Sequence, residues 1–239
     1  MDIGQLTHIG NVRQTNQDSL VVREDLNLFV VADGMGGHEG GEMASAVACE
    51  VIPQAVADGR TLQEALIQAH QAILDHPISR AAGTRAPGTT AVVVKTHVDG
   101  QAEIAWMGDS RIYLWRKRDG REQLLQVTRD HSHVQYLVDV GMITPEQARH
   151  HPHRNVITKA LGMQDDAGND PDERRLSLVA GDRLLLCTDG LNGEIEDAHI
   201  QDLLGNTQRT AQEVCEDLVS AALEAGGHDN VSVVVLTWQ

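Results

Sequence analysis

Four acidic residues of this 239-residue chain stand at the ends of apolar runs, each with glycine or asparagine beside it. Asp33 follows the run 26–32, Asp189 closely follows RLLLC, Asp109 lies between AEIAWM and RIYLW, and Asp229 precedes VSVVVL. Carboxylates at strand ends suit oxygen-ligand cations such as Mg²⁺ and Mn²⁺, which take few protein ligands and keep several waters. The four acids therefore indicate a divalent metal site, and they do not resemble zinc ligands.

The segment around Asp33 reads LNLFVVADGMGGHEGGEMAS (26–45), which predicts a buried strand, a glycine-rich hinge and then a helix. Five glycines between 33 and 41 allow positive φ angles and close approach of the backbone to a ligand, at an entropic cost. An Asp-Gly pair is also a common turn signal. From this segment alone, Asp33 could be either a ligand or a turn residue.

Two other Asp-Gly pairs, at 99–100 and 119–120, provide a comparison within the chain. Each pair separates two strand-like runs. We expect both to be two-residue hairpin turns that need no ligand. The surrounding sequence thus separates acids that turn a hairpin from acids that end a strand at a chemical site.

Composition excludes several classes of partner. The chain has 19 basic and 35 acidic residues and a formal charge of −16, which argues against nucleic acid or an anionic membrane as a partner. No run reaches the roughly 18 apolar residues of a membrane span, and the N-terminus lacks the apolar core of a signal peptide. Cys49, Cys187 and Cys215 are far apart, as expected of free thiols. We expect a cytoplasmic protein, with a monomer as the default.

The predicted elements indicate α+β layering and not a doubly wound parallel sheet, because antiparallel hairpins have helices before and after them. Helices are expected after Thr61 and Thr210, each of which has glutamate three residues later as in a capping box. Pro53 is expected to kink or interrupt the preceding helix. The polar segment 164–175 is expected to be an exposed loop, and the spacing of its acids fits no EF-hand.

Histidines are concentrated between residues 130 and 157, where five of the 12 occur. They are His131, His133, His150, His151 and His153. No predicted helix or strand focuses them on one point and no cysteine accompanies them, which argues against a zinc site. A structural role is expected for His131.

The chain resembles the metal-dependent protein phosphatases, the type 2C Ser/Thr phosphatases, and their bacterial members in particular. The motifs that carry the resemblance are Arg13-x-x-Asn16-Gln17-Asp18, VADGMGGHEGGEMAS (31–45), Gly88-Thr89-Thr90, Gly108-Asp109-Ser110-Arg111, Thr128-x-Asp130-His131-Ser132, Thr188-Asp189-Gly190-Leu191 and Gly227-x-Asp229-Asn230. The implied fold is a central antiparallel β-sandwich flanked by α-helices on both faces. One phosphatase domain over residues 1–239 is implied, with a flap at about 130–157.

The resemblance also implies the metal ligands. Asp33 would bridge two Mn²⁺ or Mg²⁺ ions, and the carbonyl of Gly34 would bind one of them. Asp189 and Asp229 would complete the second ion. Asp109 together with Asp189 would form a weaker third site of the kind seen in bacterial members.

Three further residues are implied to act on the substrate or on water. Asp18 would hold metal-bound water, and Arg13 would clamp the phosphoryl group, because a guanidinium grips phosphate oxygens in pairs. His38 is expected to be the general acid, since an imidazole titrates near neutrality. The chain has Gln17 where many members have glutamate, and Met35 where the eukaryotic branch has its general-acid histidine.

The implied reaction is hydrolysis of phosphoserine and phosphothreonine monoesters by direct attack of a water that bridges two ions about 3.5–4 Å apart. Phosphorylated proteins are the implied substrates, and a Ser/Thr kinase and its targets are the implied partners. Two alternatives remain open. A metal-dependent nuclease or phosphodiesterase is disfavoured by the net charge, and a catalytically weak phosphatase fold that binds or regulates is disfavoured by the complete set of acids.

Overall fold

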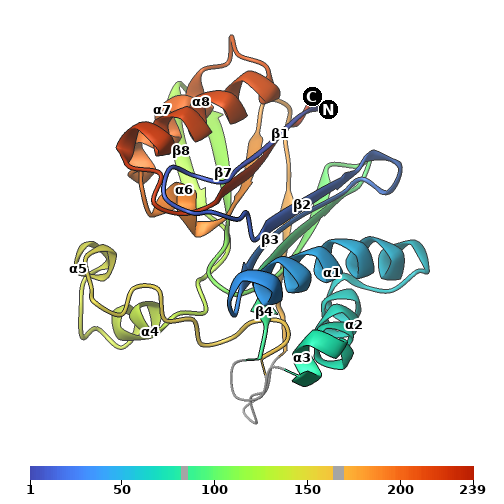
Figure 1. Ribbon diagram of the computed structural model, residues 1–239. Coiled ribbons are helices and arrows are strands. Elements are labelled where there is room, and N and C mark those ends of the chain that lie inside the picture. The colour runs from blue at the N-terminus through green and yellow to red at the C-terminus, as the bar shows by residue number, and fades with distance from the viewer. Residues whose placement is uncertain (82–85, 164–169) are drawn as a thin grey trace.

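The computed structural model describes residues 1–81, 86–163 and 170–239, whose strands form two antiparallel sheets (Figure 1). The strands are β1 Asp2–His8, β2 Asp18–Arg23, β3 Leu28–Met35, β4 Gly88–Thr89, β5 Ala91–Thr96, β6 Gln101–Met107, β7 Arg111–Arg118, β8 Arg121–Gln126, β9 Asp172–Ser177, β10 Arg183–Cys187 and β11 Val231–Thr237. One sheet has the order β1-β11-β10-β7-β8. The other has the order β2-β3-β5-β6-β9, with β4 paired to β3.

Helices cover the outer face of each sheet, and two others, α4 His133–Asp139 and α5 Pro145–Arg149, lie beside the sandwich (Figure 1). The remaining helices are α1 His38–Ala57, α2 Leu62–Asp75, α3 Pro77–Ala81, α6 Asp189–Asn192, α7 Asp197–Gly205 and α8 Ala211–Ala225, with a 3-10 turn at Glu24–Leu26. Helices α1 and α2 pack on the sheet that contains β3, and α7 and α8 pack on the sheet that contains β10 (Figure 1). The predicted sandwich with helices on both faces is confirmed.

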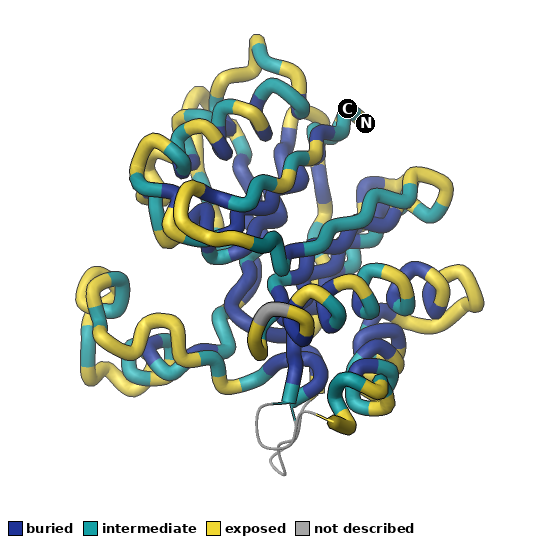
Figure 2. The backbone as a smooth tube through the Cα atoms, in the orientation of Figure 1, coloured by how far each residue is buried: buried dark blue, intermediate teal, exposed yellow. Residues whose placement is uncertain are grey.

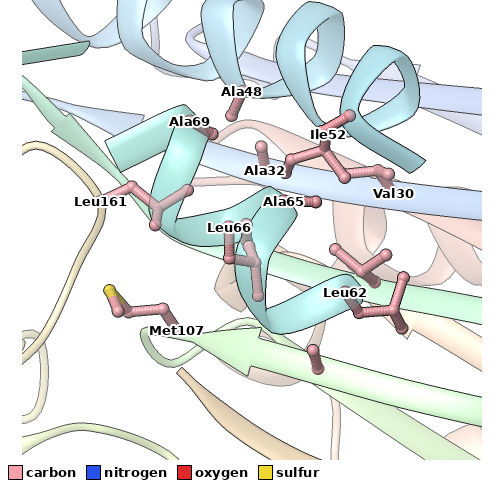
Figure 3. Close-up of a cluster of buried hydrophobic side chains, with 14 of the residues drawn as sticks. Val30, Ala32, Ala48, Ile52, Leu62, Ala65, Leu66, Ala69, Met107 and Leu161 are labelled. Carbon is pink, nitrogen blue, oxygen red and sulfur yellow. The ribbon is translucent and has the colours of Figure 1, made fainter. Parts of the chain in front are cut away.

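Burial on both faces explains the unbroken apolar run of β3. Val30 and Ala32 point toward α1 and α2, where Ile52 and Leu66 meet them (Figure 3). The alternate residues, such as Phe29, belong to the apolar layer between the two sheets. Side chains alternate along a strand, so a strand buried on both faces must be apolar throughout. Figure 2 shows this buried centre and the more exposed α4 and α5 beside it.

Local sequence signals place the starts of two helices correctly and fail at Pro53. Thr61 and Thr210 both form the predicted capping boxes with the glutamate three residues on. Helix α1, however, runs through Pro53 to Ala57, so the predicted interruption is wrong. Proline removes one backbone donor, but the fully buried Ile52 just before it holds the helix against its neighbours.

The two comparison pairs of Asp and Gly differ from each other. Asp119 and Gly120 have φ of 52° and 74° and join Arg118 directly to Arg121, which confirms the two-residue turn. The pair at 99–100 belongs to a longer loop, because β5 ends at Thr96 and pairs there with Ala102. That prediction is corrected: the His97 amide donates to the carbonyl of Gln101 (2.8 Å), so three residues, 98–100, form the turn. Within it the Gln101 amide donates to Oδ1 of Asp99 (3.0 Å), which is an Asx turn.

The predicted loop 164–175 also needs correction. Residues 172–175 belong to β9, which pairs with β6 from Asp172↔Trp106 to Ser177↔Gln101. An edge strand is held by backbone hydrogen bonds and leaves its charged side chains in water, so apolar periodicity is absent. Residues 164–169, including the acids Asp165 and Asp166, lie outside the described part of the chain. Among the residues that are described, no helix is long and apolar enough to cross a bilayer.

Candidate active site

Five aspartates from both sheets meet at one end of the sandwich. Asp18 and Asp33 are paired residues of β2 and β3, and Asp109 follows β6. Asp189 opens α6 directly beyond β10, and Asp229 precedes β11. The charges of all four other carboxylates act on Asp33. The structure therefore brings together every acid that the sequence predicted for the site.

Glycines bring these segments into backbone contact. A Cβ on Gly34 would lie 2.1 Å from the carbonyl oxygen of Gly41, so the end of β3 touches the first turn of α1. Gly36 and Gly37 take positive φ angles of 114° and 89° in the connection. The predicted positive φ is thus found at two glycines. At Gly34 and Gly41 the close neighbour is another part of the backbone.

A second glycine contact brings Asp189 beside Asp229. A Cβ on Gly190 would lie 2.0 Å from the carbonyl oxygen of Asn230. Asp229, in the turn before β11, is approached by a second glycine: a Cβ on Gly10 would lie 2.2 Å from the carbonyl oxygen of Asp229. Both glycines are therefore required for the loops to approach each other this closely.

Asn230 fastens the loop that carries Arg13, a role that the sequence did not reveal. Its Oδ1 accepts a hydrogen bond from the Gln17 amide (2.8 Å), and its Nδ2 donates to the carbonyls of Ile9 (2.9 Å) and Thr15 (3.0 Å). The asparagine thus holds both ends of the loop with one side chain. Its place directly after Asp229 in the Gly-x-Asp-Asn motif was the only signal in the sequence.

Asp18 is held by two hydroxyl groups that sequence reasoning also missed. Thr188 and Ser232 donate to its Oδ2 at 2.9 and 2.8 Å, whereas its buried Oδ1 has no hydrogen-bond partner among the residues that the structure describes. Removal from water raises the pKa of Asp18 to about 7, although the two hydroxyl groups favour the charged form.

The Gly-Thr-Thr motif links Asp33 to the loop of Asp109. The Asp33 amide donates to Oγ1 of Thr90 (3.0 Å), and this hydroxyl also shares a hydrogen bond with Oγ of Ser110 (2.6 Å). The fully buried Thr90 therefore fixes the spacing between two candidate ligands.

The metal-free cluster carries more negative charge than its surroundings favour. Burial, followed by repulsion from the neighbouring carboxylates, raises the pKa of Asp33 and of Asp109 well above the usual range. The same two causes raise the pKa of Asp189 to about 6. A divalent cation would remove both penalties, because it replaces water at the oxygens and offsets the repulsion.

Two buried oxygen atoms show that the site fits a cation. Oδ1 of Asp18 and Oδ1 of Asp109 are both shielded from solvent, and within the described residues neither has a hydrogen-bond partner. Such atoms are costly unless an ion or water satisfies them. In the described ranges no three acidic, histidine or cysteine side chains are already arranged to hold an ion. The carboxylates would therefore have to close around the metal.

Arg13 lies at the rim of the acidic cluster. Its guanidinium donates to both oxygens of Asp229, from Nε at 2.8 Å and from Nη2 at 2.7 Å. A cavity of about 400 Å³ begins here and is lined by Arg13, Gln17, Gly37 and His228, among other residues. His38 is the first residue of α1, next to this cavity lining, and its side chain lies outside what the structure describes.

The histidines between 130 and 157 do not join the acids. The rings of His133, His151 and His153 have centroids 5.6–6.3 Å apart, closer than the sequence suggested. Nδ1 of His151 accepts from the His153 amide (3.1 Å), so in the neutral ring the other nitrogen carries the proton and cannot bind a metal. His131 has the expected structural role, because its ring stacks on Trp106 and its Nδ1 accepts a backbone hydrogen bond.

Comparison with known proteins decides the family. The model of the family described as protein phosphatase 2C matches residues 7–227, which include the arginine loop and four of the five aspartates. The chain belongs to the protein phosphatase 2C family. Protein phosphatase PhpP of Streptococcus pneumoniae is 36% identical over 247 residues, covering 99% of this chain and 97% of that protein. Serine/threonine protein phosphatase PstP of Mycobacterium tuberculosis is 36% identical over 95% of this chain and 43% of its own length.

Solved structures of the type 2C phosphatases share the whole architecture. The crystal structure of Mycobacterium tuberculosis PstP superposes with a TM-score of 0.87 and 34% identity, covering 99% of this chain and 98% of that one. A structure of the PstP catalytic domain in complex with two manganese ions gives a TM-score of 0.82 and 33% identity, with coverages of 98% and 96%. The manganese ions of that structure are in keeping with the two buried carboxylate oxygens, on Asp18 and Asp109, that lack hydrogen-bond partners among the described residues of this chain.

Proposed function

We propose that this type 2C family member is a metal-dependent protein phosphatase that hydrolyses phosphoserine and phosphothreonine monoesters. The observation that carries the proposal is the cluster of five aspartates, in which one buried oxygen each of Asp18 and Asp109 has no hydrogen-bond partner in the described ranges of the chain. The similarity to named Ser/Thr phosphatases, and to one solved with manganese, supports it.

The candidate ion ligands come from four connections: the end of β3, the β6–β7 turn, the start of α6 and the turn before β11. Asp33 and the carbonyl of Gly34 would hold the first ion, and Asp33, Asp189 and Asp229 the second. Asp109, with Asp189, would hold a weaker third ion. Bound Mn²⁺ or Mg²⁺ supplies activation of water near neutral pH and stabilisation of the charge that develops on the phosphoryl group.

Arg13 would bind the phosphoryl oxygens of the substrate. Its two donors already grip a pair of oxygens on Asp229, and a phosphate presents the same geometry. Because a cation would compete for this carboxylate, the guanidinium would be released toward the neighbouring cavity when the site is loaded. Lysine cannot reproduce the paired contact.

Asp18 would not bind an ion directly but would orient water bound to the metal. Two hydroxyl groups hold its Oδ2, so the unpartnered Oδ1 is the atom left to accept a hydrogen bond. His38 would protonate the departing serine or threonine oxygen. It follows Gly37, which lines the cavity with Arg13, and an imidazole titrates in the range that this step needs.

Phosphorylated proteins are the proposed substrates, and a Ser/Thr kinase that makes them is a proposed partner. The reducing cytoplasm is the proposed location, because Cys49, Cys187 and Cys215 are all free thiols and the last two are buried.

Phosphate release from a phosphothreonine peptide tests the proposal. Purified protein with about 1–2 mM Mn²⁺, an excess chosen because the site must be saturated, should release phosphate, and EDTA should abolish release until Mn²⁺ is restored. A protein that binds Mn²⁺ and the peptide without turnover would instead be the binding or regulatory module. Cleavage of DNA without release from the peptide would favour the nuclease.

A further inference from the structure

His131 contacts the loop that carries Asp109 at two points. Its backbone amide donates to the carbonyl of Gly108 (2.9 Å), and the Gly108 amide donates to Nδ1 of its ring (3.1 Å). One residue thus satisfies both backbone groups of the glycine directly before the candidate ligand. The two residues are 23 positions apart, so chain connectivity does not hold them together.

Gly108 is a strained position whose geometry sets the direction of Asp109. Its φ is 109°, which side-chain-bearing residues rarely adopt, and an added Cβ would lie 2.5 Å from the side chain of Thr90. The peptide at this glycine is therefore trapped between Thr90 on one side and His131 on the other. Movement of either contact would turn the following carboxylate.

The ring of His131 is itself held in place. It stacks on Trp106 with centroids 6.3 Å apart and an interplanar angle of 17°, and only 10% of the side chain is exposed. The carbonyl of His131 accepts from the Thr158 amide (2.8 Å), beside the bridge between Ser132 and Ile157. His131 thus sits where the chain enters and leaves the segment that contains α4 and α5.

We propose that His131 is a positioning residue for the metal site, which fixes the peptide of Gly108 and so holds the Asp109 carboxylate in the cluster. The inference rests on the proposed role of Asp109 as an ion ligand. It assigns to the Asp-His-Ser motif a purpose beyond packing. Because the Gly108 amide is a donor, the essential feature of the ring is the acceptor at Nδ1.

A matched pair of substitutions separates the acceptor from the bulk of the ring. In His131→Asn the side-chain oxygen can take the place of Nδ1, whereas His131→Leu fills space without an acceptor. In metal-free protein, His131→Leu should accelerate hydrogen exchange at the Gly108 amide by about fivefold or more, as expected for loss of a hydrogen bond of about 1 kcal/mol. His131→Asn should restore most of the protection.

Calorimetric titration with Mn²⁺ alone gives the second readout. Loss of a supporting contact typically weakens a metal site by about 10–100-fold, so His131→Leu should weaken the weakest Mn²⁺ step by about tenfold or more and spare the tighter steps. Asp109→Asn should remove the same step. The double variant should lose no more than Asp109→Asn alone, because both changes act on one site.

The outcomes are separable from those of the phosphatase assay. Unchanged Mn²⁺ binding and unchanged Gly108 exchange in His131→Leu would overturn the inference, as would losses in His131→Asn equal to those in His131→Leu. If the wild type binds Mn²⁺ with a step that Asp109→Asn removes and still releases no phosphate, the proposed function fails while the role of His131 stands.

Discussion

Arg13 and Asp229 form a bidentate ion pair, in which Nε and Nη2 of Arg13 donate to separate carboxylate oxygens of Asp229 at 2.8 and 2.7 Å. The proposed phosphate clamp is therefore paired with a proposed metal ligand. Both groups remain partly exposed, with 55% and 37% of the side chain accessible, so water screens their attraction and opening the pair costs little. Opening this one contact would free Asp229 for a cation and Arg13 for a phosphate.

Arg13→Ala should weaken turnover of a phosphothreonine peptide without weakening Mn²⁺ binding. Hydrogen bonds to charged groups contribute about 1.5–3 kcal/mol, which corresponds to a roughly ten- to hundredfold loss in kcat/KM. Removal of the guanidinium also leaves Asp229 free for the metal. Steady-state kinetics and calorimetry measure the two effects. Full activity of Arg13→Lys would contradict a bidentate contact between Arg13 and the phosphoryl oxygens.

Asp33→Asn and Asp189→Asn should each reduce activity by more than about a hundredfold, since even the outer partners of metal ligands cost about 10–100-fold. Asp99→Asn is the matched control. It also changes an Asp-Gly pair, but it retains the oxygen that accepts from the Gln101 amide in the hairpin. Rates at saturating Mn²⁺ provide the measurement. Equal losses in all three variants would mean that Asp33 and Asp189 do not differ in role from the turn residue Asp99.

His38→Ala should slow hydrolysis of alkyl phosphates by about 10²–10⁴-fold, the usual contribution of a general acid. Aryl phosphates should suffer less, because their leaving groups need less protonation. The ratio of the two rates is the informative quantity. An undiminished rate on a phosphoserine peptide would remove His38 from the mechanism.

The stability of the metal-free protein should fall as pH rises through the acidic and neutral range. Burial raises the pKa of Asp18 to about 7 and that of Asp189 to about 6 in the folded state. The folded chain then binds more protons than the unfolded chain, so the stability contributed by these groups is present at low pH and lost as pH approaches 7.

Thermal unfolding at several pH values checks this dependence. Mn²⁺ should raise the melting temperature more at pH about 8 than at pH about 5, because protons compete with the ion for the carboxylates. Asp18→Asn provides the control, since it removes one of the raised titrations and should flatten the slope. A metal-free protein whose stability rises steadily between these values would contradict the raised pKa of Asp18.

The sequence predicted the fold class and the acids, because both leave local signals. The unbroken apolar run of β3 and the capping glutamates at 64 and 213 can be found within a few residues of sequence. Strand β9 could not be found in this way, because its pairing with β6 depends on the backbone and not on apolar side chains. The length of helix α1 likewise depends on tertiary packing around Pro53.

The supporting residues of the site were harder to predict than the acids. Asn230 acts on Gln17 and Thr15 across more than 200 residues, and Ser232 reaches Asp18 over a similar separation. Their residue types are common in loops and strands and carry no signal by themselves. His131 could be assigned only a general structural role until its contact with Gly108 was seen.

Anomalous diffraction from crystals grown in Mn²⁺ tests the central claim most directly. The account predicts at least two manganese peaks within bonding distance of Asp33, with Asp189 and Asp229 closed around one of them and Arg13 released from Asp229. Peaks elsewhere on the protein, or no peak while Asp33, Asp189 and Asp229 point away from one another, would contradict it.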